Sequence, residues 1–370
     1  MANNRTRLIF QNLNLFVGPA ALSGSTATGA LYTSGNSGNN LIAEISRVQN
    51  ATLNVSINRQ DVNQFGQLNR IDSAMINPPT VSLDFGYYST NGYNEYLLGM
   101  NAKGGSLISG IQTKVSDSKN YFIAVSPQGV DDNYYQGTDR DVYAIGNGFI
   151  SNYTFNAAVG QLPTASVTVD ALNVESYTSS SGQQTPAINT ETSNRITNWT
   201  FQLPVGNPIT GNGIVSALRP GDISLSFPSA AGFMSSLSGD NRAHIQSVSL
   251  SVPISREVLN ELGSFYGYSR EIQFPVNASM SIRGLATSAL PTGFSSLLCN
   301  DQFFDLALTV RQPACGGTGA AGLVYRFNRA KVTNWSNGHS IGGNSTLDLT
   351  LTSQLAGATS LNGITLSGSY

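Results

Sequence analysis

The densest group of side chains that could do chemistry is acidic and lies within residues 129–146, GVDDNYYQGTDRDVYAIG. Its four carboxylates belong to Asp131, Asp132, Asp139 and Asp141. Carboxylates at such short spacing can bind calcium or act as a paired acid and base. Their spacing is not that of an EF-hand loop, so a solvated hairpin is the simpler interpretation. If this hairpin faces a channel, its negative charge repels DNA phosphates.

Two aromatic side chains, Tyr134 and Tyr135, lie at the expected tip of this acidic segment. Exposed aromatic residues on a loop suit a contact with another protein or with a sugar. Alternatively, both rings fold back onto their own sheet. The sequence leaves both interpretations open, and we treat the four aspartates and two tyrosines together as a candidate interface or channel lining.

The chain contains few residues of the types that catalysis uses. Its only histidines and cysteines are His244, His339, Cys299 and Cys315. Metal sites built from His and Cys, and triads that need a His base, are therefore excluded. A glycine pattern of the nucleotide-binding kind at 317–322 runs into a strand-like stretch and not into a helix. We expect no catalytic residue, no metal ligand, no cofactor and no enzyme activity.

The composition excludes several further classes of protein. Only 11% of the 370 residues are charged, against a usual value of about 25%, and the formal net charge is −2. Without a basic field the chain is not expected to clamp a nucleic-acid backbone. We also expect no secretion signal and no membrane span, because no apolar run approaches roughly 18 residues. Glycine, serine and asparagine favour turns and strand ends, which argues against a helical bundle.

An internal repeat is the most informative pattern in the sequence. Residues 48–66 align without gaps on residues 245–263 at an offset of 197, with seven identities in 19 pairs. Residues 142–160 align on residues 324–342 at an offset of 182. The blocks occur in the same order in both halves, and units of this length are whole domains and not solenoid repeats. The sequence therefore predicts two copies of one fold.

The two predicted domains are residues 1–195, copy one, and residues 196–370, copy two. Residues 176–194, before the boundary, are rich in Ser, Thr, Gln and Asn and show no apolar period, which predicts a linker or a long surface loop. Because the second offset is smaller than the first, copy two lacks part of the loop between the blocks. The longer segment of copy one, residues 126–141, is expected to make a stacking or channel contact that copy two does not.

Alternation of apolar and polar residues predicts β-strands through most of both copies. In the first such strand Ala51, Leu53, Val55 and Ile57 share one side, and residues 248–254 repeat this pattern. Further strand-like runs are 80–86, 121–125, 164–174, 222–227, 277–283, 304–310 and 345–352. We expect a mainly β fold of two tandem β-sandwich or partly closed β-barrel domains of the same fold, each with one or two short helices.

The clearest helix candidate in each copy follows this first strand. In copy two, Ser255 can cap a helix, residues 258–262 place three apolar side chains on one face, and Gly263 suits the left-handed C-terminal position. In copy one, residues 60–65 show the same pattern less well.

Both copies have an arginine directly after their first alternating strand. Arg59 and Arg256 occupy matching positions in a chain that uses few charges. We favour a structural junction, in which the guanidinium forms an ion pair or binds backbone carbonyls. The alternative is a contact with a neighbouring subunit.

Together the repeated patterns resemble the tail tube proteins of tailed bacteriophages. The pattern is an alternating strand, then Ile-x-Arg-x-x-[Val/Leu]-Asn-x-[Phe/Leu]-Gly, a proline-led strand (NPPTVSLDF, FPVNASMSI) and a VY…[Ile/Val]-[Ser/Thr]-Asn-[Tyr/Trp] block. The stretch GFISNYTFNAAVGQLPTASVTVDALNV is the part most similar to phage virion proteins.

The resemblance implies a β-sandwich whose inner sheet joins those of its neighbours around a channel. Family rings commonly hold six domains, so a two-copy chain is expected to form a ring of three subunits with pseudo-sixfold symmetry, and rings stack. The tube is a passive conduit through which double-stranded DNA passes without specific binding, and the family has no catalytic residues.

The resemblance also implies partners and a location. The partners are further copies of the chain and other tail proteins, namely the tape measure, a baseplate or terminator protein and, in some tails, a sheath. The location is the virion tail, after synthesis in the host cytoplasm and with no membrane contact. Two other functions fit the composition: a capsid decoration or fibre-base protein, and a carbohydrate-binding β-sandwich module with exposed aromatic residues.

Overall fold

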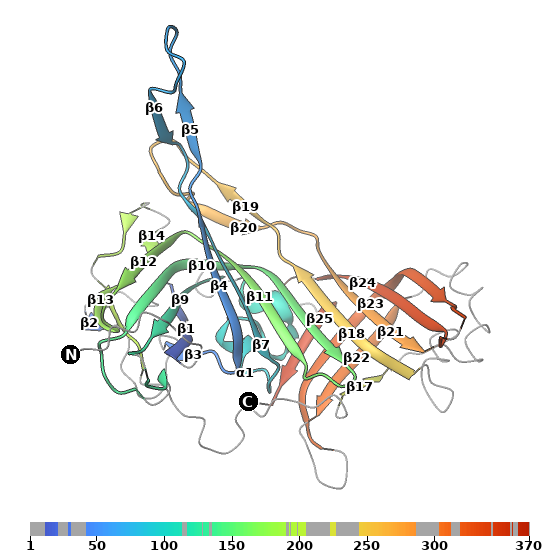
Figure 1. Cartoon of the computed structure of the whole chain (residues 1–370). Helices are drawn as coiled ribbons and strands as arrows, with labels where there is room; N and C mark the ends of the chain where they lie inside the picture. The colour runs from blue at the N-terminus through green and yellow to red at the C-terminus, as the bar shows by residue number, and fades with distance from the viewer. Residues whose placement is uncertain are drawn as a thin grey trace.

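The computed structural model of the chain is a mainly antiparallel β structure with little helix (Figure 1). The structure describes residues 12–20, 29–30, 42–112, 117–127, 129–132, 135–189, 192, 194–197, 199–204, 223–226, 244–285, 303–311, 319–341, 343–355, 357 and 362–369. The predicted mainly β fold is confirmed, with strands in each of the seven further runs. The main sheet is open, because its path ends at β4 and β17 and does not close into a barrel.

Eight strands form a continuous path through this sheet, in which the second half of the chain continues the first (Figure 1). In order they are β4 (Val48–Ser56), β7 (Thr80–Tyr88), β11 (Thr164–Ala171), β10 (Asp141–Ala158), β18 (His244–Pro253), β21 (Val276–Leu285), β24 (Thr346–Leu355) and β23 (Ala321–Gly338). Each group has the same topology: the first and second strands along the chain are neighbours, the fourth strand follows, and the third strand lies last. The two groups meet where β10 pairs antiparallel with β18.

The two long strands, β10 and β23, belong to two layers at once. Their second halves lie in the eight-strand path, and their first halves pair with a second layer. This layer contains β9 (Ser118–Val125) and β12 (Asn173–Tyr177) beside β10, and β22 (Phe304–Arg311) and β25 (Gly363–Gly368) beside β23. Smaller strands extend it: β1 (Leu13–Pro19), β3 (Ala43–Glu44), β8 (Lys103–Ser106) and β17 (Ile223–Ser226).

Both long strands bend at matching positions. Each has a β-bulge in its pairing with the second layer, and Asn147 and Arg329 within these bulges have positive φ angles of 49° and 52°. A positive φ is uncommon for a residue other than glycine. The distance between the two residues along the chain is 182, the offset of the second aligned block.

A buried carboxyl group connects the two groups of strands inside the core. Helix α1 (Tyr93–Leu97) places Glu95 at 0% exposure, where its Oε1 accepts hydrogen bonds from the hydroxyls of Tyr87 (2.9 Å) and Tyr153 (3.1 Å). The Tyr153 hydroxyl on β10 also lies 2.6 Å from that of Tyr325 on β23. Burial raises the pKa of Glu95, which favours its neutral form.

The helices predicted after the first strand of each copy are wrong. These residues form extended hairpins, β5 (Arg59–Val62) with β6 (Asp72–Met75) and β19 (Arg256–Leu259) with β20 (Ser269–Ile272). Each hairpin continues the strand pair beneath it, so the extended pairing overrides a short helical pattern. Gly66 and Gly263 do adopt the left-handed conformation, with φ of 87° and 92°. The described helical elements include α1 and the 3-10 turn Leu107–Gly110, both in residues 1–195.

Residues 176–194 are predicted to be a linker or a long surface loop, but their described part contains short paired strands and buried residues. They contain β13 (Ser181–Gln184) and β14 (Ile188–Asn189), which pair with β16 (Trp199–Gln202) and β15 (Asn194–Arg195); β2 (Gly29–Ala30) also pairs with β16. Ile188 is 4% exposed, and its N–H donates to Oδ1 of Asn147 at 2.6 Å. A Cβ on Gly146 would lie 2.1 Å from the carbonyl oxygen of Pro186. Backbone contacts of this kind leave no apolar period in the sequence.

The two matching isoleucines give a test of this architecture. Ile254 is 1% exposed and Ile57 is 49% exposed in the single chain. We predict that Ile254→Ala lowers the free energy of unfolding by about 2–5 kcal/mol because it leaves a cavity. Ile57→Ala should change it by less than about 0.5 kcal/mol in the unassembled chain. Urea unfolding at low protein concentration measures both, and equal losses would contradict the assigned burial.

Candidate assembly interface

Strands from the two halves of the chain meet in one antiparallel junction. Residues 152–158 of β10 lie antiparallel to residues 247–253 of β18. The core-facing pairs are Tyr153/Val252, Phe155/Leu250 and Ala157/Val248, and each of these side chains is at most 5% exposed. Each strand therefore covers the apolar row of the other and satisfies its backbone hydrogen-bonding groups.

Strand β4 matches β18 in sequence, but one side of it is open. Among the described strands it pairs only with β7. Val55 and Ile57 are 43% and 49% exposed, whereas the matching Val252 and Ile254 are 0% and 1% exposed. The strand also contains neither proline nor a charged residue, the features that natural sheet edges use to prevent pairing. This edge is suited to accept another strand.

The second half of β23 is the other open edge. It pairs with β24 on one side, and no described strand pairs with its other side. The matching half of β10 is covered on that side by β18. As a result, Trp335 is partly exposed and Asn337 is exposed, whereas the matching Tyr153 and Phe155 are both 0% exposed.

The two open edges are complementary in register. Applying the offsets of 182 and 197 to the internal junction gives these pairs between one chain and a second copy: Trp335/Val55, Ser336/Asn54 and Asn337/Leu53. This second junction is the more polar one, because Asn337 replaces the phenylalanine at position 155. A more polar edge reduces non-specific association of the unassembled chain.

The face of the eight-strand path that points away from the core is polar and carries few charges. Its alternate residues on β4, β10 and β18 are Thr52, Asn54, Ser56, Asn152, Thr154, Asn156, Ser247, Ser249 and Ser251. Its charges include Asp84 and the exposed pair Arg283–Asp348, whose N–O distance is 3.6 Å. A surface of hydroxyl and amide groups has no basic field that would hold a nucleic-acid backbone.

The β19–β20 hairpin lies against copy one, with Arg256 at the junction. Arg256 forms a bidentate ion pair with Asp117, at N–O distances of 2.6 and 3.0 Å, and donates to the carbonyl of Ile150 at 3.3 Å. The guanidinium groups of Arg256 and Arg270 lie 5.1 and 5.6 Å from the centre of the Phe149 ring. Arg256 thus has both kinds of partner expected of a structural junction, a carboxylate and a backbone carbonyl.

The β5–β6 hairpin projects away from the rest of the chain, and Arg59 on it is exposed (Figure 1). At its far end Phe65 and Leu68 are fully exposed, at 104% and 111%. Asp61 and Arg70 form an ion pair at 2.9 Å, but both are at least half exposed, so the pair stabilises the hairpin little. Large apolar side chains on a projecting hairpin mark a contact surface.

The acidic segment is folded around a buried arginine and is not a solvated hairpin throughout. Asp132 is 2% exposed, and its Oδ1 lies 3.1 Å from Nε of Arg140, which is 1% exposed. Arg140 also donates to the carbonyls of Tyr135 (2.7 Å) and Pro204 (3.1 Å). Asp132 therefore stabilises this segment and is not available as an interface or channel residue.

The other candidates in this segment lie nearer the surface. Asp131, Asp139 and Asp141 are exposed, and the partly exposed Tyr135 donates its hydroxyl to Asp139. The Tyr135 ring centre lies 5.6 Å from the Arg140 guanidinium, so this ring folds back onto its own segment. Tyr134 lies outside the described residues.

Two further expectations concern metal ions and membranes. Among the described residues, no group of three His, Cys, Asp or Glu side chains is placed to hold a metal ion. No helix in the described ranges is long and apolar enough to cross a membrane. Of the glycine pattern at 317–322, Gly322 lies within β23.

Sequence reasoning missed the residues that receive the β19–β20 hairpin. Phe149 has no apolar counterpart in the repeat, because the matching position 331 holds a lysine, and Asp117 lies outside both aligned blocks. Arg140 had a weak signal, because it lies between Asp139 and Asp141 in a chain with few charges.

Comparisons with solved structures give partial likenesses, of which two are described here. No protein family and no curated protein matches the sequence. A chain from the tail of an empty gene transfer agent particle, refined with helical C6 symmetry, matches 42% of this chain and 100% of its own, with 16% identity and a TM-score of 0.25. A chain from the virion of a native gene transfer agent particle matches 35% of this chain and 86% of its own, with 17% identity and a TM-score of 0.22. At these scores neither likeness carries an argument about function.

The carboxyl of Glu44, beside the acidic segment, gives a pH-dependent prediction. Burial raises its pKa to about 7, and the nearby charge of Asp132 adds to this, while Asn14 and Arg140 act in the opposite direction. The folded chain thus favours the neutral Glu44 carboxyl. The resulting gain in the free energy of unfolding is complete below pH 4.5 and is lost as the pH rises through about 7.

We predict that Glu44→Gln raises the free energy of unfolding at pH 8, by up to about 3 kcal/mol, and leaves it nearly unchanged at pH 4.5. Urea unfolding at the two pH values measures this difference. A variant that is less stable than the parent at pH 8 would show that the carboxylate is stabilised in the folded chain, contrary to this account.

Proposed function

We propose that the chain is a structural virion protein that assembles head to tail into rings, and that stacked rings form the tail tube of a phage-like particle. In this role the tube is a passive conduit for DNA, and the chain carries out no catalysis. Its partners are further copies of itself and the proteins that start, measure and end the tail.

The observation that carries this proposal is the internal junction. Within one chain, β10 is the last strand of the first four-strand group in the sheet, and it pairs with β18, the first strand of the second group. The matching strands at the two ends of the eight-strand path are β23, in its second half, and β4. Each has one side that no described strand covers. Repeating one junction between chains therefore extends the sheet without any change of fold.

A head-to-tail contact of this kind generates a closed ring or an open filament. We propose that residues 1–195 and 196–370 are two copies of one domain and that three chains, with six copies, close the ring. The matching bulges at Asn147 and Arg329 and the shared strand order support the two-copy division. With all edges paired, a ring has no open strand left in this sheet.

The proposal assigns the polar face of the eight-strand path to the channel. If this face lines the ring, DNA meets hydroxyl and amide groups with few cations among them. Because counterion release by basic groups drives most backbone binding, such a wall lets DNA pass without holding it.

Cysteine cross-linking tests the register between chains. In a background with Cys299→Ser and Cys315→Ser, we predict that Asn54→Cys with Ser336→Cys forms disulfides between chains under mild oxidation, ending at species of three chains. The pair corresponds to Thr154 opposite Ser251 in the internal junction, where directly opposite side chains lie close together.

The matched control is Asn54→Cys with Asn337→Cys, because neighbouring residues of a strand point to opposite faces. Its cross-linking yield should be less than about a tenth of that of the first pair. Equal yields from the two pairs, or no cross-linking at concentrations that give assemblies, would overturn the proposed strand pairing.

A further inference from the structure

We propose that the β5–β6 hairpin of one copy docks into the basic pocket beside β23 of the next copy and brings Asp61 to the cations of that pocket. This inference rests on the proposed function, because it assumes the β23–β4 junction. The occupant of the pocket is thus a second copy of this chain.

The contact of β19–β20 within the chain is the template for the proposed contact of β5–β6 between chains. The β19–β20 hairpin presents Arg256 and Arg270 to Phe149, and Arg256 pairs with Asp117. The charge of Asp170 on β11 also acts on Arg270. In this contact the hairpin is cationic and the surface that receives it is acidic.

The receiving surface of copy two has the opposite charge. The offset of 182 takes Phe149 to Lys331, Asn147 to Arg329 and Asp170 to Thr352. The matching bulges and positive φ angles at Asn147 and Arg329 show that the offset holds locally in the structure. Copy two thus has cations in place of the ring and the amide of copy one, and a neutral threonine in place of the carboxylate.

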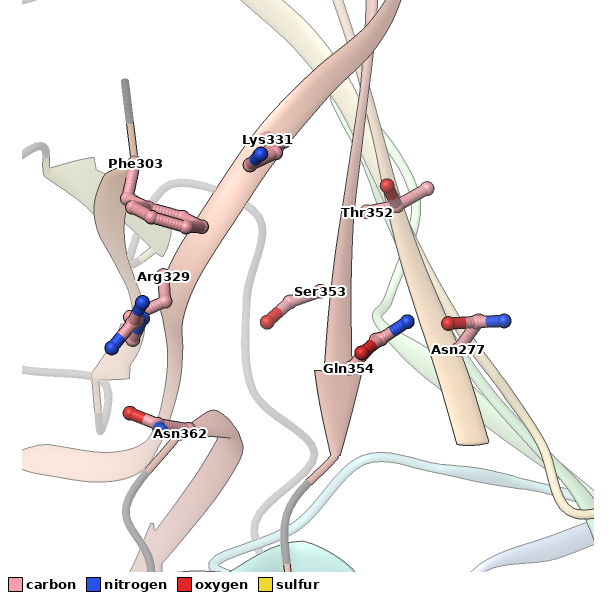
Figure 2. A pocket seen from close by; sticks show the side chains of 8 residues that line it. All are labelled: Asn277, Phe303, Arg329, Lys331, Thr352, Ser353, Gln354 and Asn362. Atoms are coloured by element: carbon pink, nitrogen blue, oxygen red, sulfur yellow. The ribbon is translucent and has the colours of Figure 1, made fainter. Parts of the chain in front are cut away.

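These cations line a pocket of about 520 Å³ (Figure 2). The guanidinium of Arg329 and the ammonium of Lys331 lie 4.4 and 4.8 Å from the centre of the Phe303 ring. Polar side chains complete the lining: Asn277, Thr352, Ser353, Gln354 and Asn362. The pocket is therefore suited to a carboxylate on an extended segment.

The β5–β6 hairpin carries that carboxylate on the corresponding face. Cross-strand partners share a face, so Arg59 and Met75, and Asp61 and Ser73, lie on the face that matches the docked face of β19–β20. By the offset of 197, Arg59 can donate to the carbonyl of Val332 as Arg256 does to that of Ile150. Asp61 is the one carboxylate on this face of the two strands and takes the place of Val258, which is 43% exposed in the docked hairpin. Docking exchanges its exposed pair with Arg70 for the cations of the pocket.

The two hairpins differ in charge on this face. β19–β20 presents Arg256 and Arg270 without a carboxylate, so it would bring two further cations to Arg329 and Lys331. Like charges brought together at an interface suppress a wrong partner.

Assembly of full-length variants tests the inference, measured by sedimentation as the protein concentration at half-assembly. We predict that Asp61→Lys raises this concentration at least about tenfold, because a further cation meets the pocket. The control, Asp72→Lys, makes the same change on the opposite face of the same hairpin and should shift it less than about twofold. Combining Asp61→Lys with Lys331→Asp should restore assembly to within about threefold of the parent.

Equal effects of the two lysine variants, or no recovery in the double variant, would overturn the docking of Asp61 in this pocket. The Asn54/Ser336 cysteine pair separates this failure from that of the proposed function. If the parent chain forms those cross-links while Asp61→Lys changes nothing, only the hairpin docking is wrong. If the cross-links are absent as well, the junction between chains is wrong and the docking fails with it. Far-UV circular dichroism checks that each variant is folded.

Discussion

The antiparallel pairing of β10 with β18 is the interaction on which the rest of the structure depends. It joins two groups of four strands with the same order into one sheet, and it brings Tyr153 of β10 within reach of Glu95 and of Tyr325 from β23. A strand can pair on both of its sides. The eight-strand path therefore ends with one open side on β4 and one on the second half of β23. The proposed self-assembly repeats between chains the pairing that joins the two halves within the chain.

Although the chain has few charged residues, two of its ion pairs are largely buried and hold segments in place. Arg140 and Asp132 are buried together within the acidic segment, and Arg256 with Asp117 fixes one hairpin. The open strand β4 has no charge at all. Buried ion pairs add little net stability but penalise the loss of one partner, so they determine where segments lie more than how stable the fold is.

Alternation and the repeat predicted the strands well, because a period of two and a fixed offset are local features of the sequence. They also located the matching strands β4 and β18 and the matching arginines. The hairpins were misread because residues 258–262 fit one helical turn, and only pairing with β20 decides the conformation. The packing of residues 176–194 and the clamp around Arg140 depend on backbone carbonyls, which no side-chain pattern reveals.

Cryo-electron microscopy of the assembled protein tests the central claim most directly. The account predicts rings of three chains with six similar lobes, in which the second half of β23 runs beside β4 of the next chain and the polar face surrounds an open channel. A ring held together through other strands, or a chain that stays monomeric with β4 uncovered at every concentration, would contradict it.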